Sequence, residues 1–206
     1  SPETRKSLLE NMRDESNWLI GVVENLLSVT RMSGASNIKK ELEAGEEVLG
    51  AASMKFKRHY PAVEVSITAP DTLLMIPMDI ILIEQVLINL MENAVQHGKT
   101  TTRIELRLSS AGGLAVFEVA DNGCGIARED VPVAFLRHAT SKVRTAKDLD
   151  AIHTLGFRGE ALASIASVAR VEVLTRTADA ECASVYHIEG GEEQPMEPGA
   201  RGVGTT

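Results

Sequence analysis

Apolar residues recur at three- and four-residue steps along the N-terminal segment of the chain. If this segment is helical, they form one wide stripe: Leu8, Leu9, Met12, Trp18, Leu19, Val22, Val23, Leu26, Leu27 and Val29. Pro2 suits the first turn of a helix, and Gly34 can end one in the left-handed conformation. The pattern predicts an amphipathic helix within residues 1–33 whose stripe packs against another helix.

Residues 38–206 alternate between helical and strand patterns. Helical spacing predicts helices at 41–60 and 80–96, the second capped by Asp79, and further helices at 129–138, 148–153 and 158–168. Alternation predicts strands at 63–67, 103–108, 114–120, 170–177 and 183–189, and a short run adds one at 73–77. The strands come largely in hairpin-like pairs, so the sequence predicts an α+β fold with a mixed sheet rather than a doubly wound fold.

Composition narrows the class of protein. A chain of 206 residues, 44% of them hydrophobic, can bury one sizeable core. The net charge of −8 argues against DNA as a partner, since non-specific DNA affinity needs clustered cations. No stretch reaches the roughly 18 apolar residues of a membrane span, so no membrane contact is expected of this fragment. Cys124 and Cys182 lack the spacing of a zinc site, which favours free thiols and a cytoplasmic location.

Two asparagines, Asn89 and Asn93, share one side of the predicted helix at 80–96 because they are four residues apart. An amide oxygen can complete the coordination of a Mg²⁺ ion that also binds phosphate oxygens and water. The alternative is that both are polar residues on the solvent side of an amphipathic helix.

A glycine loop, Asp121-Asn122-Gly123-Cys124-Gly125, follows directly after a predicted strand. A carboxylate at a strand end can accept a hydrogen bond from an exocyclic amine such as that of adenine. The glycines let the backbone approach a ligand closely. A plain turn between strands is the alternative.

Two later loops carry groups that suit phosphate. The loop at 138–142 offers hydroxyls and an ammonium, and the loop at 156–162 places glycines at a helix start, where free N–H groups can bind an anion. The alternative is that neither loop binds a ligand: the first is then a surface loop and the second an ordinary start of a helix.

Taken in order, these motifs resemble the Bergerat (GHKL) ATP-binding superfamily, and the two parts of the chain resemble different members of it. Residues 1 to about 126 are similar to a KdpD-type sensor histidine kinase: 3–31 resembles the second helix of its dimerisation hairpin, and 77–97 its N box. Residues from about 121 to 206 resemble the N-terminal ATPase of MutL-type mismatch repair proteins, in 138–142, 156–162 and 204–206. The glycine loop belongs to both families, as expected of a chimera joined there or of a natural fusion.

The resemblance implies a Bergerat α/β sandwich that binds ATP with Mg²⁺. It assigns the metal to Asn93, the adenine amine to Asp121 and the adenine-binding floor to Thr205. It assigns the adenine-side loop and the lid over the phosphates to Gly123, Gly125, Thr140, Ser141, Lys142, Gly156, Phe157, Arg158 and Gly159.

Departures from both families bear on activity. Asn89 and Glu92 are the candidate catalytic residues, but in the MutL family a glutamate at the position of Asn89 activates water, and an amide cannot take that proton. The rotation of the helix between Asn89 and Glu92 directs the Glu92 side chain away from the position that would activate water. The phosphoacceptor histidine of the kinase family belongs to a helix that would precede Ser1.

We therefore expect ATP binding with weak or no hydrolysis, by a protein that resembles a histidine kinase or an ATPase. The alternative is a recombined or interaction protein without a working nucleotide site. A homodimer through residues 5–32 is expected, because a lone amphipathic helix leaves its apolar stripe in water.

Overall fold

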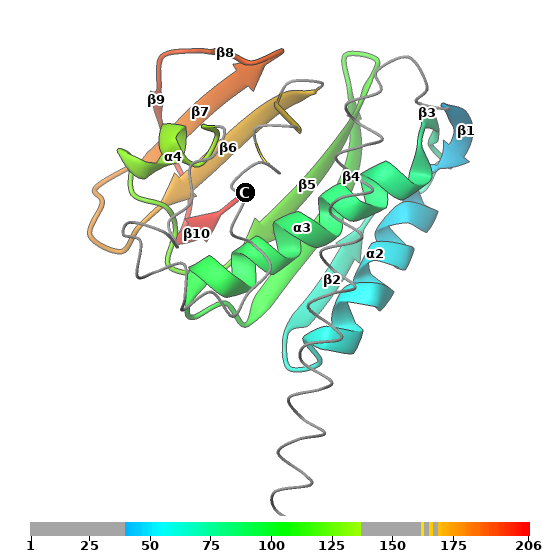
Figure 1. The fold of residues 1–206 in the computed structure, drawn as a ribbon, viewed down its shortest axis with the longest axis horizontal. Helices are drawn as coiled ribbons and strands as arrows, with labels where there is room; N and C mark the ends of the chain where they lie inside the picture. Colours follow the sequence, from blue (N-terminus) through cyan, green and yellow to red (C-terminus); the bar gives the residue numbers. More distant parts are fainter. Residues whose placement is uncertain (1–39, 137–161, 163–164, 167–168) are drawn as a thin grey trace, which may run out of the picture.

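The computed structural model describes residues 40–136, 162, 165–166 and 169–206 (Figure 1). The predicted helices at 1–33 and 148–153, and most of the one at 158–168, lie outside these residues. Within the described residues, no helix is long and apolar enough to cross a membrane.

A three-stranded sheet with two helices on one face forms the larger part of the fold (Figure 1). In this sheet β2 (Glu64–Thr68) runs parallel to β4 (Arg103–Ala111), and β4 pairs antiparallel with β5 (Leu114–Asp121). The helices α2 (Gly45–His59) and α3 (Ile80–Gly98) cover the face to which the buried side chains of β4 point: Ile104, Leu106 and Leu108. The sheet is mixed, as the sequence predicts.

The sequence of α3 accounts for its position. Asp79 caps it by accepting a hydrogen bond from the Leu82 N–H at 3.2 Å. Leu87 and Met91, four residues apart, are buried against the sheet and α2. The helix ends at Gly98, beyond which Lys99 has a φ of 52°.

A second sheet is built from the C-terminal part of the chain, in the order β10-β6-β7-β8 with β9 also on β7. Its strands are β6 (Arg170–Arg176), β7 (Ala183–Glu189), β8 (Glu192–Glu193), β9 (Glu197–Gly199) and β10 (Gly204–Thr205). A separate core of Val131, Phe135, Ala166, Tyr186 and Ile188 joins this sheet to α4 (Asp130–Val133). Strand β10 contacts β5 and so connects the two sheets.

Two predicted helices differ from the structure. The predicted helix at 41–60 begins later, because residues Glu41–Ala44 form β1 and pair antiparallel with β3 (Met75–Met78). Leu42 and Ala44 alternate with glutamates, and the partner strand decides between the two periods. The predicted helix at 129–138 is reduced to α4, since the Phe135 and Leu136 N–H groups bond to carbonyls only three residues back.

Candidate functional site

Asp121 lies at the end of β5, on the face of the sheet that the helices cover. It is directly opposite Ile104, and side chains of opposed residues in an antiparallel pair share one face. Its Oδ1 accepts a hydrogen bond from the Gly123 N–H at 2.7 Å, and its backbone carbonyl accepts one from Arg201 Nη2 at 2.9 Å. The carboxylate is therefore fixed in direction.

The surroundings of Asp121 change its acidity. Burial raises the pKa of Asp121 above its ordinary value, although the N–H groups of Gly123 and Thr205 and the charge of Arg201 act in the opposite direction. A carboxylate that has lost hydration favours a ligand that can donate a hydrogen bond to it.

The glycine loop lies directly against the end of α3. A Cβ on Gly123 would meet the Thr101 hydroxyl and would lie 2.8 Å from Gly98 Cα. The Cys124 N–H donates to the Gly98 carbonyl at 3.0 Å. No side chain other than hydrogen fits at Gly123 without displacing this contact.

Gly125 makes a second close contact, with the other sheet. Its φ of +74° suits glycine, and a Cβ there would collide with the backbone carbonyl of Arg176. The loop is thus packed between α3 and β6 by backbone contacts.

Asn122 holds the glycine loop in place, and its side-chain oxygen is already occupied by backbone N–H groups of the protein. Its Oδ1 accepts from the N–H groups of Thr102 at 3.0 Å and Arg103 at 2.9 Å, and its Nδ2 donates to the Thr102 hydroxyl at 2.9 Å. Both ends of the amide therefore connect the loop to the start of β4.

Asn93 lies on the flank of α3 that faces away from α2. Glu84, which pairs with Lys55 of α2 at 2.5 Å, is nine residues earlier, and nine residues of α-helix correspond to a half-turn difference in direction. Asn93 also precedes Gly98, the residue that contacts the glycine loop, by about 7.5 Å along the helix axis.

The two candidate catalytic residues share α3 with Asn93. Asn89 accepts a hydrogen bond from Gln85 Nε2 at 3.0 Å, within the same helix. Glu92 is half-buried, and helical geometry places it about 100° around the axis from Asn93.

Thr205 lies beside Asp121 because β10 closes onto the end of β5. A Cβ on Gly204, whose φ is +128°, would collide with the Asp121 carbonyl. Thr205 pairs with Thr175 of β6, and their hydroxyl oxygens are 3.0 Å apart. Sequence reasoning missed both Thr175 and Arg201, since neither lies in a motif.

The structure thus brings together Asp121, Gly123, Gly125 and Thr205, with the Asn93 helix ending on the same loop. The remaining predicted ligand residues lie outside the described residues: Thr140, Ser141, Lys142, Gly156, Phe157, Arg158 and Gly159.

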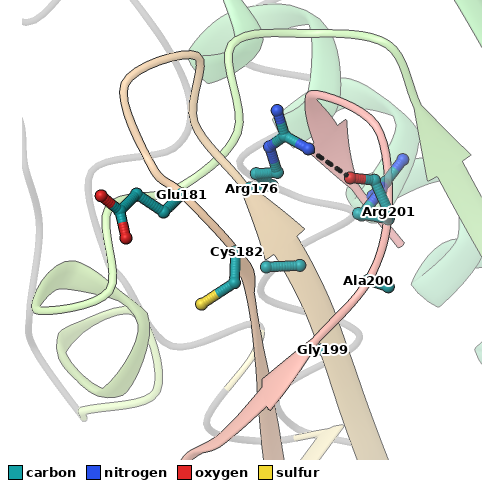
Figure 2. Close-up of a pocket in the computed structure, with 7 residues that line it drawn as sticks. Arg176, Glu181, Cys182, Gly199, Ala200 and Arg201 are labelled. Carbon is teal, nitrogen blue, oxygen red and sulfur yellow. Dashed lines mark hydrogen bonds between the residues drawn. The ribbon is translucent and has the colours of Figure 1, made fainter.

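Two cavities border Arg201. One, of about 590 Å³, lies between the turn after β6 and the Gly199–Arg201 segment; Figure 2 shows Arg176 there, with Nη1 donating to the Arg201 carbonyl at 3.2 Å. The other, of about 350 Å³, is lined by Arg103, Glu105 and Arg107, which alternate with the buried residues of β4. It therefore opens on the sheet face opposite the helices, and Asp121, Asn122 and Thr206 line its edge as well. Asn93 lines neither cavity, so the candidate site rests on the contacts around Asp121.

Comparison with known proteins identifies the class. The model of the family "Histidine kinase-, DNA gyrase B-, and HSP90-like ATPase" matches residues 78–172, a range that contains α3, the glycine loop and the start of β6. These residues belong to that family, and the chain has the GHKL ATPase fold.

Two families within this class are similar to the chain. The DNA mismatch repair proteins MutL of Agathobacter rectalis and Thiobacillus denitrificans are 48% and 47% identical to it over 117 residues, 57% of the chain. The chain spans less than a fifth of their length, 18% and 19%. Because 117 residues cannot fit between residue 121 and the C-terminus, this similarity extends upstream of the glycine loop.

Solved histidine kinases share the fold over more of the chain. Full-length ShkA in complex with AMPPNP is 20% identical, with a TM-score of 0.63, covering 95% of this chain and 40% of that one. The mycobacterial sensor histidine kinase MprB is 18% identical, with a TM-score of 0.53, covering 78% and 98%. At these identities the likeness concerns the fold.

Proposed function

We propose that the chain is an ATP-binding module that holds Mg²⁺-ATP between α3 and the glycine loop, with little or no hydrolysis. In this proposal Asp121 accepts a hydrogen bond from the adenine amine, Thr205 lies at the floor of the adenine pocket, and Asn93 ligates Mg²⁺. The observation that carries it is the Asp121 carboxylate, which faces the helix side of the sheet and is fixed by backbone N–H groups.

The acceptor capacity of Asp121 supports the adenine assignment. A carboxylate has about four lone-pair sites, and the Gly123 N–H occupies one of them at 2.7 Å. The remaining sites accept but cannot donate. They therefore suit an amino group and disfavour a carbonyl at the same place.

The magnesium assignment depends on the position of α3. Asn93 lies on the flank away from α2, about 7.5 Å along the axis from the helix end that contacts the glycine loop. That separation lets one nucleotide contact Asp121 with its base and Asn93 through its phosphate-bound metal. AMPPNP, the ligand in the similar ShkA structure, is an ATP analogue and supports the same ligand class.

Weak hydrolysis is proposed from the candidate catalytic residues. Asn89 has no carboxylate to take a proton from water, and its oxygen already accepts from Gln85. Glu92 lies about 100° around the helix from Asn93, away from the proposed metal ligand.

The remaining assignments come from the resemblance. Thr140, Ser141, Lys142 and the segment 156–159 would contact the phosphates. Residues 1–33 would form a dimerisation helix before a GHKL domain at 38–206, and the kinase-like part would give way to the MutL-like part in or before α3, since the MutL similarity begins no later than residue 90. The free cysteines, Cys124 and Cys182, support a cytoplasmic location.

Isothermal titration with Mg²⁺ and a non-hydrolysable ATP analogue tests the proposal. We expect saturable binding that EDTA weakens, with phosphate release near the background rate when ATP is used. Thermal unfolding provides a second readout, because a ligand at a hundredfold excess over its Kd adds about 2.7 kcal/mol of stability. A folded protein that shows neither heat nor a thermal shift would instead be a non-binding, recombined or interaction protein.

Two further measurements test activity and assembly. Transfer of radiolabelled phosphate to an added histidine-bearing hairpin would establish kinase activity. Light scattering tests the proposed dimer, and a monomer would contradict it.

A further inference from the structure

Thr175 is a buried hydroxyl between two parts of the proposed adenine pocket. The residue is 1% exposed and lies one position before the end of β6. Its Oγ1 accepts from the Ile126 N–H at 2.8 Å, donates to the Gly204 carbonyl at 3.1 Å and lies 3.0 Å from Thr205 Oγ1. One hydroxyl therefore contacts the residue after the glycine loop and both residues of β10.

Counting protons fixes the direction of these bonds. A hydroxyl has one proton to donate and two lone pairs to accept with. The Ile126 N–H can only donate and the Gly204 carbonyl can only accept, so the single proton of Thr175 goes to Gly204. For all three contacts to be hydrogen bonds, Thr205 must donate its own proton to Thr175.

The consequence falls on Thr205. Its hydroxyl proton is directed to Thr175, so its hydroxyl oxygen offers only lone pairs to a ligand. Asp121 also offers only acceptors. The two residues then form one acceptor edge, which matches an amino group and repels a carbonyl oxygen.

We infer that Thr175 is a positioning residue for base recognition: it orients the Thr205 hydroxyl as a hydrogen-bond acceptor, so that the pocket selects a purine with an amino group over one without. This inference rests on the proposed ATP-binding function. It goes beyond that function because Thr175 touches no ligand and acts through Thr205.

The test compares two nucleotides that differ only at the amino group. ATP and purine riboside 5′-triphosphate, which lacks the 6-amino group, are titrated with Mg²⁺ into the wild type, Thr175→Val and Thr175→Ser. The wild type should prefer ATP. In Thr175→Val that preference should fall about fivefold, the effect of one neutral hydrogen bond, and GTP should be rejected less strongly. Thr175→Ser retains the hydroxyl and should restore the preference.

The outcomes separate the two proposals. A folded Thr175→Val that loses affinity equally for both nucleotides, with an unchanged preference, shows a merely structural role and overturns the inference alone. A folded wild type that binds neither nucleotide overturns the proposed function and the inference together. Should Thr175→Val fail to fold, Thr175→Cys takes its place, since a thiol bonds weakly. An unchanged preference in Thr175→Cys also overturns the inference.

Discussion

Asp121→Asn should separate ATP binding from stability. The amide keeps one oxygen for the Gly123 N–H, now 2.7 Å from the carboxylate, and must then turn its NH₂ toward the Thr205 N–H and the adenine amine. The lost bond is charge-assisted and contributes about 1.5–3 kcal/mol. Affinity for ATP should therefore fall about 10- to 150-fold.

Asp121→Asn should leave the free energy of unfolding nearly unchanged or should raise it, although it lowers ATP affinity. Burial raises the pKa of Asp121, which means that folding disfavours its charged form at neutral pH. Removing the charge removes that cost and offsets part of the lost hydrogen bonding. Without nucleotide, the variant should melt near the wild-type temperature.

Titration calorimetry with Mg²⁺-ATP and nucleotide-free thermal unfolding measure the two effects. Glu118→Gln is the matched control, because it neutralises a carboxylate on the same strand, three residues earlier and on the opposite face, where Glu118 lies 3.9 Å from Arg107. The control should bind ATP normally. Binding by Asp121→Asn within a factor of two of wild type would refute the adenine assignment.

Three other changes have defined outcomes. Gly204→Ala places a Cβ against the Asp121 carbonyl at a φ of +128°, so ATP affinity and melting temperature should both drop. Gly202→Ala is the control, because no atom lies within 4 Å of its Cβ, and it should leave both quantities unchanged. Titration calorimetry measures the affinity and thermal unfolding measures the melting temperature. Gly50→Ala in α2, also without a neighbour within 4 Å, should raise the free energy of unfolding by about 0.5–1 kcal/mol in urea titrations, and a loss would contradict the helical assignment. Acidification should weaken ATP binding at a higher pH than an ordinary aspartate would cause, because the pKa of Asp121 is raised and its protonated form is a poorer acceptor. The contribution of Asp121 to the free energy of unfolding should become more favourable over the same fall in pH, since the native state takes up the proton more readily than the unfolded state. If ATP binding by the wild type had the same pH dependence as ATP binding by Asp121→Asn, Asp121 would not be the cause.

The sequence predicts the long elements of this fold because each carries several turns of one period. Helix α3 has its cap at Asp79 and its buried side chains at Leu87 and Met91, all visible as a pattern. Strands β1 and β10 have four and two residues, too few for a period. Their conformation comes from the partner strand, which the local sequence does not contain.

The candidate site likewise contains residues that the sequence predicts and residues that it does not. Asp121 and its glycines could be predicted because residue type and order already limit what they can do. Thr175 and Arg201 could not, since their roles come from contacts made across long sequence separations. Thr175 contacts Ile126, 49 residues away, and Arg201 contacts Asp121, 80 residues away.

Three close glycine contacts around Asp121, with the end of α3 and with the second sheet, bear on the proposed recombination of two families. Gly123 packs on the backbone of Gly98, Gly125 on the carbonyl of Arg176, and Gly204 on the carbonyl of Asp121. Each contact places a glycine against main-chain atoms, and at Gly123 the Thr101 hydroxyl lies beside it as well, so none of the three positions accepts a side chain without displacing its neighbours. Because the 117-residue similarity to MutL begins no later than residue 90, within α3, the proposed change from kinase-like to MutL-like sequence would lie in or before α3 and not at these contacts.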